Sequence, residues 1–242
     1  MWDRSLFPLL GAHAASRSYW HCRGSVHIAA LLFLLGAMLV ACVTASAERA
    51  PDRAVRIVAL GDSLTAGLGL PANAAFPARL ETALKAKGLL VEIINAGVSG
   101  DTASRGLGRL DWSVPEGTDA VIVELGANDM LMGVDPKVTR NALTEIVRRL
   151  TGRGIAVLLA GMRPAPNLGA DYGRTFESIY SELAAEYGLL FYPFFLDGVA
   201  ADARLNQADG IHPTAAGVDQ IVMRILPTVE ELVAQVRRRR PT

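Results

Sequence analysis

At 242 residues, the chain has room for one sizeable α/β domain or two small ones. Its 24 basic and 24 acidic residues cancel, so there is no basic surplus of the kind that nucleic-acid binding requires, and we expect no nucleic-acid partner. Hydrophobic residues make up 51% of the sequence, and much of this excess lies in one stretch, residues 27–47.

The N-terminal stretch has the pattern of a secretory signal peptide. Residues 1–27 carry three arginines and one aspartate, residues 28–43 carry no charge, and Ala45-Ser46-Ala47 matches the small-x-small cleavage site. We predict a signal peptide over residues 1–47 and export to the periplasm or beyond. The alternative is a permanent membrane anchor, but about 16 apolar residues are short for a hydrocarbon core that needs roughly 20.

Cys42 allows a second interpretation of the same stretch. Leu39-Val40-Ala41-Cys42 resembles a bacterial lipobox, in which the cysteine is lipidated, so a lipid anchor at Cys42 stays open. The other cysteine, Cys22, also lies in the predicted signal, and His212 is the only histidine beyond residue 47. The mature chain therefore needs no disulfide and offers no cluster of histidines or cysteines for zinc, and we expect no metal and no cofactor.

From residue 48 onward, short apolar runs alternate with helical patterns. Near-continuous apolar runs are typical of strands in a parallel sheet that is covered on both faces. The runs are residues 55–60, 91–95, 120–124 and 155–160, with a weaker fifth at 189–193. Apolar residues spaced three and four apart predict helices around 76–84, 143–150 and 176–187.

The C-terminal part of the chain predicts more helix. Residues 214–236 have helical periodicity with Pro227 in the middle, which favours two helices or one kinked helix. Residues 237–242 are predicted to be a basic tail, and residues 48–236 a single domain. Strand and helix alternate throughout this domain, so we predict a flavodoxin-like three-layer α/β/α sandwich around a five-stranded parallel sheet.

Polar loops follow the first three predicted strands, and each holds a group useful in catalysis. Ser63 comes directly after the first strand, Gly97 after the second and Asn128 after the third. Because the carboxyl ends of parallel strands meet at one edge, these groups should converge there. A hydroxyl beside a glycine N–H and a side-chain amide makes a nucleophile with an oxyanion hole. Alternatively, Asp62 or Ser63 merely caps the next helix.

A serine nucleophile needs a base, and His212 is the histidine left to supply it. It lies in Asp209-Gly210-Ile211-His212-Pro213, where Asp209 can turn back to one ring nitrogen while the other faces Ser63. A lone histidine before a helix is more often a turn or cap residue. Here the serine, glycine and asparagine favour a catalytic role.

These blocks resemble those of the SGNH (GDSL) hydrolases, and in particular the bacterial periplasmic esterases of that family with thioesterase, arylesterase and lysophospholipase activity. The resemblance implies that Ser63, Asp209 and His212 form a triad. It also implies that Gly97, Asn128 and the Ser63 N–H form the oxyanion hole, and that the sheet has the order 2-1-3-4-5. The matching blocks are Gly61-Asp62-Ser63-Leu64, residues 95–102, residues 124–129, Pro193-Phe194-Phe195 and residues 209–213.

Apolar residues directly after Asn128 are candidates for substrate binding. If Met130, Leu131 and Met132 face the site together with Leu64 and Ile211, they form an apolar wall for an acyl chain. The alternative is that they fill gaps in the core. Three acidic residues of the same blocks are expected to bond backbone within their own loops, namely Asp62, Asp101 and Asp129.

The sequence therefore predicts an exported serine esterase that cleaves carboxylic esters, and possibly thioesters or lysophospholipids, through an acyl-enzyme. The substrate is a small molecule, with an apolar acyl chain if the wall forms. The rival functions are a deacetylase of acetylated carbohydrates and a non-catalytic lipid- or glycan-binding domain. We predict no membrane span after processing, and the sequence does not predict the oligomeric state.

Overall fold

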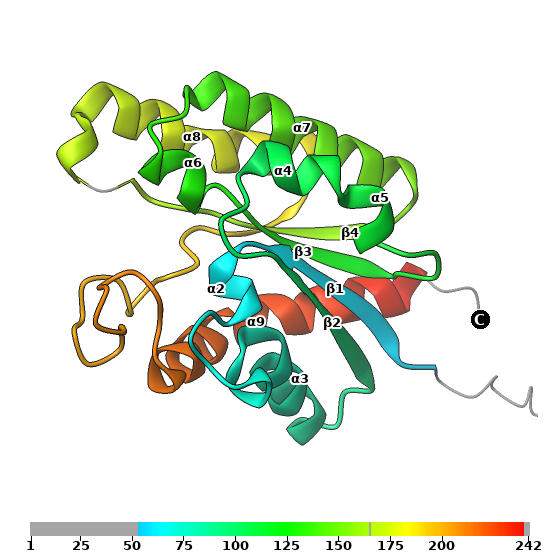
Figure 1. Cartoon of the computed structure of the whole chain (residues 1–242). Helices are drawn as coiled ribbons and strands as arrows, with labels where there is room; N and C mark the ends of the chain where they lie inside the picture. The colour runs from blue at the N-terminus through cyan, green and yellow to red at the C-terminus, as the bar shows by residue number, and fades with distance from the viewer. Residues whose placement is uncertain (1–52, 165, 240–242) are drawn as a thin grey trace, which may run out of the picture. The chain divides into compact units, whose positions relative to one another are not determined.

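A computed structural model describes residues 53–164 and 166–239. Its centre is a five-stranded, all-parallel sheet in the order β2-β1-β3-β4-β5 (Figure 1). The predicted strands and sheet order are confirmed, with ends that differ by at most two residues. The strands are β1 (Val55–Gly61), β2 (Val91–Gly97), β3 (Ala120–Glu124), β4 (Ala156–Ala160) and β5 (Leu190–Tyr192).

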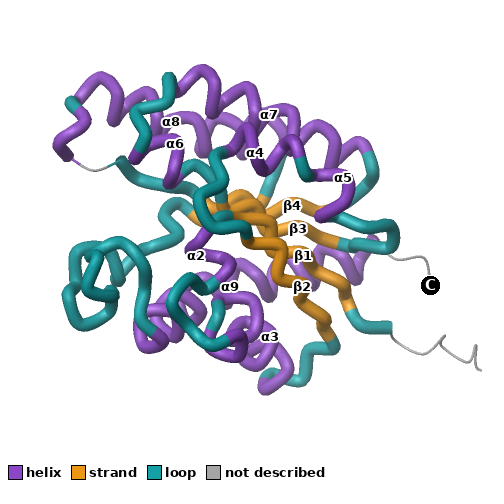
Figure 2. Tube along the Cα trace, viewed as in Figure 1, coloured by secondary structure: helices purple, strands orange, loops and turns teal. Residues whose placement is uncertain are grey.

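Helices cover both faces of the sheet, as a covered parallel sheet requires (Figure 2). On one face lie α3 (Phe76–Ala86) and α9 (Ala215–Arg239), which pack against each other. On the other face lie two long helices that pack against each other, α7 (Pro136–Gly152) and α8 (Ala170–Tyr187). The same face also carries two short helices, α4 (Ala103–Gly108) and α5 (Leu110–Ser113). The three-layer sandwich predicted from the alternation is confirmed.

Local sequence explains where α7 begins and which side it buries. The side chain of Asp135 caps the helix by accepting a hydrogen bond from the Lys137 N–H at 2.9 Å, and Pro136 follows in the first turn. The buried residues of α7 recur three and four positions apart, so one stripe faces the sheet.

The C-terminal segment is one continuous helix, α9, with Pro227 inside it. Pro227 lacks the N–H that would complete the helix ladder, but its ring lies on the exposed side while residues such as Val229 and Leu232 pack inward. The helix runs through Arg239, so the first three residues of the predicted basic tail belong to its last turn.

The middle strands form the core of the sheet. Every residue of β3 and β4 is buried, including Glu124 at the carboxyl end of β3. Besides α4 and α5, four further short elements were not predicted from periodicity. They are α2 (Ser63–Ala66), α6 (Ala127–Leu131) and two 3-10 turns, η1 (Ala72–Ala74) and η2 (Pro166–Leu168).

The predicted signal peptide and the Cys42 lipobox lie outside the described residues, as do the last three residues of the chain. Among the helices of the described part, none is both long enough and apolar enough to cross a membrane.

Candidate active site

Ser63 lies on a tight turn at the carboxyl end of β1. The chain passes directly from Gly61 into the one-turn helix α2, and a Cβ at Gly61 would lie 2.1 Å from the Thr65 hydroxyl oxygen, so only glycine fits. Asp62 caps α2 by accepting the Leu64 N–H at 2.9 Å. The cap that the sequence offered as an alternative is thus present, and it leaves the Ser63 hydroxyl available.

The Ser63 hydroxyl is hydrogen-bonded to His212. Its Oγ lies 2.9 Å from Nε2 of His212, and Nδ1 of His212 lies 2.6 Å from Oδ2 of Asp209. The other carboxylate oxygen of Asp209 accepts the backbone N–H groups of Ile211 and His212, at 2.9 and 3.0 Å. The hydrogen bonds from the His212 backbone, the His212 ring and the Ile211 backbone lower the pKa of Asp209 to about 2. The carboxylate is therefore charged at neutral pH.

Gln207 holds the histidine loop against the serine loop. Its backbone N–H donates to the His212 carbonyl at 2.7 Å. Its side-chain amide donates to the carbonyls of Leu68 and Pro213, at 2.8 and 3.0 Å. Sequence reasoning missed Gln207, because nothing in its local pattern shows that it contacts a segment about 140 positions earlier.

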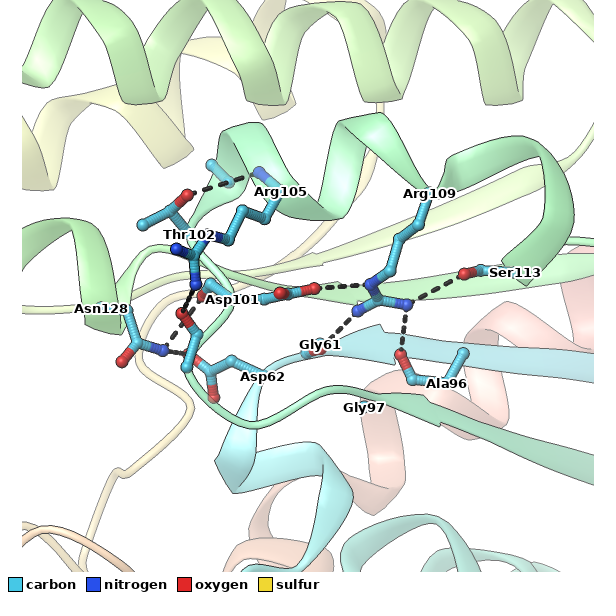
Figure 3. A network of polar contacts seen from close by, with 12 residues as sticks. Gly61, Asp62, Ala96, Gly97, Asp101, Thr102, Arg105, Arg109, Ser113 and Asn128 are labelled. Atoms are coloured by element: carbon cyan, nitrogen blue, oxygen red, sulfur yellow. Dashed lines mark hydrogen bonds and ion pairs between the residues drawn. The ribbon is translucent and has the colours of Figure 1, made fainter.

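Asn128 is brought to the site by a turn that requires glycine. Gly126 precedes α6 with φ 119°, and a Cβ there would lie 2.0 Å from the Tyr180 hydroxyl oxygen. The Asn128 amide nitrogen donates to Oδ2 of Asp62 and to the backbone carbonyl of Asp101, both at 3.0 Å (Figure 3). The amide therefore lies next to the residue that precedes Ser63.

Two glycines, Gly97 at the end of β2 and Gly100 in the loop that follows, have different surroundings. The Gly97 N–H already donates to the Asn95 side chain at 3.0 Å, and a Cβ at Gly97 would lie 2.2 Å from the Ala66 backbone nitrogen. Gly97 is thus a packing residue against α2. Gly100 has φ 83° and open space where a Cβ would be. Within the described chain, neither its N–H nor that of Ser63 has an acceptor. Geometry therefore favours Gly100 as the N–H donor expected at Gly97.

Two carboxylic acids are buried behind the turn that carries Ser63. Glu124 accepts the Thr65 hydroxyl at 2.6 Å and the Asp62 N–H at 3.4 Å, and its other oxygen has no partner within the described chain. Burial and the nearby Asp62 charge raise the pKa of Glu124 well above its usual range. Burial also raises the pKa of Asp62, to about 6. Asp62 accepts two good donors and Glu124 does not, so we assign the charge at neutral pH to Asp62.

The other two loop aspartates do not bond within their own loops, so that prediction was wrong for them. Asp101 pairs with Arg109 at 2.6 Å. Asp129 accepts the Ala103 N–H at 2.8 Å and the Thr139 hydroxyl at 2.9 Å. Both are buried and join separate elements, whereas Asp62 does cap its own turn.

The apolar residues expected around the site divide into buried and exposed ones. Leu64 is only 4% exposed and belongs to the core, and Met130 packs partly against the core. Three others are largely exposed: Leu131 at 53%, Met132 at 60% and Ile211 at 42%. Of the five, these three offer the most apolar surface to a ligand.

Across residues 53–164 and 166–239, no three histidine, cysteine or acidic side chains are grouped as metal ligands. What the site gathers instead is a serine, a histidine and an aspartate in series at the carboxyl edge of a parallel sheet, with N–H donors beside them. That arrangement defines the class of hydrolytic enzymes with a serine nucleophile.

The chain belongs to the GDSL-like lipase/acylhydrolase family, whose family model matches residues 59–220. Esterase TesA from Pseudomonas aeruginosa is 34% identical over 203 residues, which cover 84% of this chain and 98% of that protein. Thioesterase 1/protease 1/lysophospholipase L1 from Escherichia coli K12 is 37% identical over 158 residues, or 65% of this chain and 74% of that one.

Solved structures agree with this assignment. The chain is similar to AlinE4, described as an SGNH-hydrolase family esterase, with 46% identity and a TM-score of 0.63 over 74% of this chain and 96% of that one. It is also similar to the crystal structure of TesA, with 35% identity and a TM-score of 0.70 over 73% and 99%. The resemblance noted in the sequence is confirmed, and the protein is an esterase of the GDSL type.

Proposed function

We propose that the chain hydrolyses esters through an acyl-enzyme formed on Ser63. The observation that carries this proposal is the continuous hydrogen-bond series from Ser63 Oγ through His212 to Asp209, at 2.9 and 2.6 Å. A serine hydroxyl is inert near neutral pH unless a base takes its proton, and the Nε2 atom of His212 is positioned to do so.

In the proposed reaction, Ser63 Oγ attacks the ester carbonyl carbon and its proton passes to His212. The imidazolium, stabilised by Asp209, then protonates the leaving alcohol or thiol as the bond to the acyl carbon breaks. A water molecule gives its proton to His212 and attacks the acyl-enzyme. The carboxylic acid is released, and the proton returns to Ser63.

The negative oxygen of each tetrahedral intermediate needs hydrogen-bond donors. We propose the N–H groups of Ser63 and Gly100 and the amide of Asn128, with Gly100 in the place that the sequence suggested for Gly97. The two amide hydrogens of Asn128 bond to Asp62 and Asp101, so an oxyanion at this position has to share one of them.

For the substrate, we propose esters with an apolar acyl chain of medium length, with thioesters and lysophospholipids as further candidates. Support comes from the activities in the names of the relatives and from the exposed side chains of Leu131, Met132 and Ile211. Each methylene group buried against such a surface adds up to about 0.8 kcal/mol.

We also propose that the esterase is exported, with the signal at residues 1–47. Cleavage at the Ala-x-Ala site leaves Glu48 as the first residue, whereas use of the lipobox leaves a lipidated Cys42. Mass spectrometry of the protein recovered from the cell envelope distinguishes the two, and a retained Met1 would reject both.

The deciding experiment is Ser63→Ala, assayed on p-nitrophenyl esters with a fluorophosphonate probe as a second readout. We expect turnover to fall to the background rate and labelling to disappear, with unchanged thermal stability, because one hydroxyl on a turn contributes little to folding. Ser99→Ala, in the neighbouring loop, is the matched control and should keep both the turnover and the labelling. More than a few per cent of residual turnover in Ser63→Ala would reject the acyl-enzyme.

A further inference from the structure

The loops of the site share one buried cation, Arg109, which the proposed reaction does not use. Its Nε donates to Oδ2 of Asp101 at 2.6 Å, and its Nη2 donates to the Gly61 carbonyl at 2.8 Å. Its Nη1 donates to the Ala96 carbonyl and to the Ser113 hydroxyl, both at 2.9 Å (Figure 3). All three guanidinium nitrogens are therefore engaged.

The acceptors belong to the segments that carry the proposed oxyanion donors. The Gly61 carbonyl is in the peptide that leads into Asp62 and Ser63. The Ala96 carbonyl lies near the end of β2, at the start of the loop that leads to Gly100. Asp101 is held at its side chain by Arg109, while its backbone carbonyl accepts the Asn128 amide. One guanidinium thus connects the ends of β1 and β2 to Asn128.

Stability alone does not account for a charged pair at this position. The side chains of Arg109 and Asp101 are only 8% and 9% exposed, and removing two charges from water has a large desolvation cost, which their attraction offsets only in part. Apolar residues of similar volume often give equal or greater stability. What an apolar residue cannot do is hold the Gly61 and Ala96 carbonyls and the Asp101 carboxylate in one plane.

We propose that Arg109 is a positioning residue for the oxyanion hole, acting through Asp101 on Asn128, while its bonds to the Gly61 and Ala96 carbonyls fix the guanidinium at the ends of β1 and β2. This inference rests on the proposed role of Asn128. Arg109 itself touches no reacting atom, so its effect should appear in the chemical step and should depend on the presence of Asn128.

The first test is Arg109→Lys. Lysine keeps a positive charge beside Asp101, but its single nitrogen cannot also reach the Gly61 and Ala96 carbonyls. We expect kcat to fall by about 10–100-fold per active site, with KM changed less than about twofold. Active sites are counted by titration with a fluorophosphonate, so a loss of folded protein is not mistaken for a loss of rate.

A control away from the site is Arg153→Lys, at an arginine that is exposed whereas Arg109 is buried. Arg153 also donates to backbone carbonyls, those of Val114 and Pro115 at 2.8 and 3.4 Å, but these precede β3, at the opposite edge of the sheet. We expect this variant to keep kcat within about twofold. An equal loss of kcat in both lysine variants would reduce Arg109 to a general structural role and overturn the proposal.

The second test is a double-mutant cycle with Asn128→Ala. If Arg109 acts through Asn128, then Arg109→Lys should cost less than about threefold in kcat when Asn128 is already absent. The full loss in that background would overturn the proposal, as would a normal kcat in Arg109→Lys. An Asn128→Ala single variant with normal kcat would instead reject the proposed oxyanion hole, and this inference with it.

A second variant covers the case in which Arg109→Lys does not fold. Asp101→Asn keeps the loop carbonyl that binds Asn128 and an acceptor for Arg109, but removes the charge that fixes the loop to the guanidinium. It should lower kcat in the same direction and show the same dependence on Asn128. An unchanged kcat in folded Asp101→Asn would overturn the proposal.

Discussion

The two halves of the proposed active site, that of the nucleophile and that of the base, are built in different ways. The nucleophile half is carried by the ends of β1 and β3 and is buried, with Asp62, Asp129 and Glu124 fully excluded from solvent. The base half lies on an exposed loop, in which the side chain of Asp209 is 44% exposed and that of His212 is 17% exposed. The strands fix the first half, whereas the second depends on a few hydrogen bonds across a loop.

This difference indicates where each half is vulnerable. Apart from the Ser63 hydroxyl, the buried polar side chains of the nucleophile half each have two partners, so a substitution of one of them leaves buried polar groups unpaired and affects folding as well as rate. The base half has little buried surface to lose, so a substitution there should change rate with little effect on stability. The following predictions test that contrast, from the largest expected effect to the smallest.

Asp209→Asn should produce the largest loss among these variants, on the order of 10⁴ in kcat, because the amide no longer stabilises the imidazolium or fixes the ring tautomer. Its oxygen can still accept the loop N–H groups, so thermal stability should be nearly unchanged. Steady-state kinetics and thermal unfolding measure the two effects. Asp202→Asn, at a half-buried loop aspartate whose side chain is 29% exposed, serves as the control, and a loss of similar size there would remove the special role of Asp209.

Asn128→Ala should cost on the order of 10²–10³ in kcat with a smaller effect on KM, because the lost donor acts mainly on the transition state. It also leaves the buried Asp62 carboxylate without one of its two good donors, so the melting temperature should fall, unlike in Asp209→Asn. A raised KM with normal kcat would place Asn128 in ground-state substrate binding instead.

Gln207→Ala should lower kcat by roughly tenfold, because the histidine loop loses the side-chain amide that fastens it to the Leu68 and Pro213 carbonyls. The backbone bond from Gln207 to His212 remains, so the loss should be smaller than for either residue above. Hydrogen exchange of residues 207–213 should become faster in parallel. Faster hydrogen exchange with an unchanged kcat would show that catalysis does not depend on the hydrogen bonds of the Gln207 side chain.

Raising the pH from about 4 to 6 should decrease the free energy of unfolding, by at most about 1.4 kcal/mol per pH unit for each proton released. The reason is that burial raises the pKa of Asp62 to about 6, so the folded state binds a proton that the unfolded state has already lost. Asp209 has its pKa lowered to about 2, so its ionisation increases the free energy of unfolding as the pH rises, but at pH values below about 4. Urea unfolding at several pH values measures the slope, which Asp62→Asn should reduce.

The smallest expected effect concerns substrate choice. Replacing exposed Leu131 and Met132 by serine should lower kcat/KM several-fold for octanoyl esters and leave acetyl esters unchanged, because only the longer chain reaches an apolar surface. Met223→Ser, at an equally exposed methionine on α9, is the control. Two results together would favour the carbohydrate deacetylase. Acetyl esters would be hydrolysed best, and the serine variants would show the same dependence of kcat/KM on acyl-chain length as the unchanged protein.

Much of the fold could be predicted from sequence because its signals are local. A run such as 120–124 is apolar at nearly every position and had to be a covered strand, and it became β3 without a shift in its ends. The Asp135-Pro136 pair, a capping side chain followed by proline in the first turn, is likewise a local signal for the start of α7. Short helices such as α2 and α6 escaped prediction, since one turn contains too few residues to show a period.

The sequence by itself determined which chemical groups are present: one serine at the end of a strand, one histidine beyond residue 47 and an aspartate three positions before it. Only the tertiary structure decided which backbone N–H groups are available, because the acceptor of the Gly97 N–H and the open surroundings of Gly100 depend on how the loop folds against α2. It alone also showed that Arg109 connects the loops. Its partners lie up to 48 positions away, and a hydrogen bond over that separation leaves no periodic trace in the sequence.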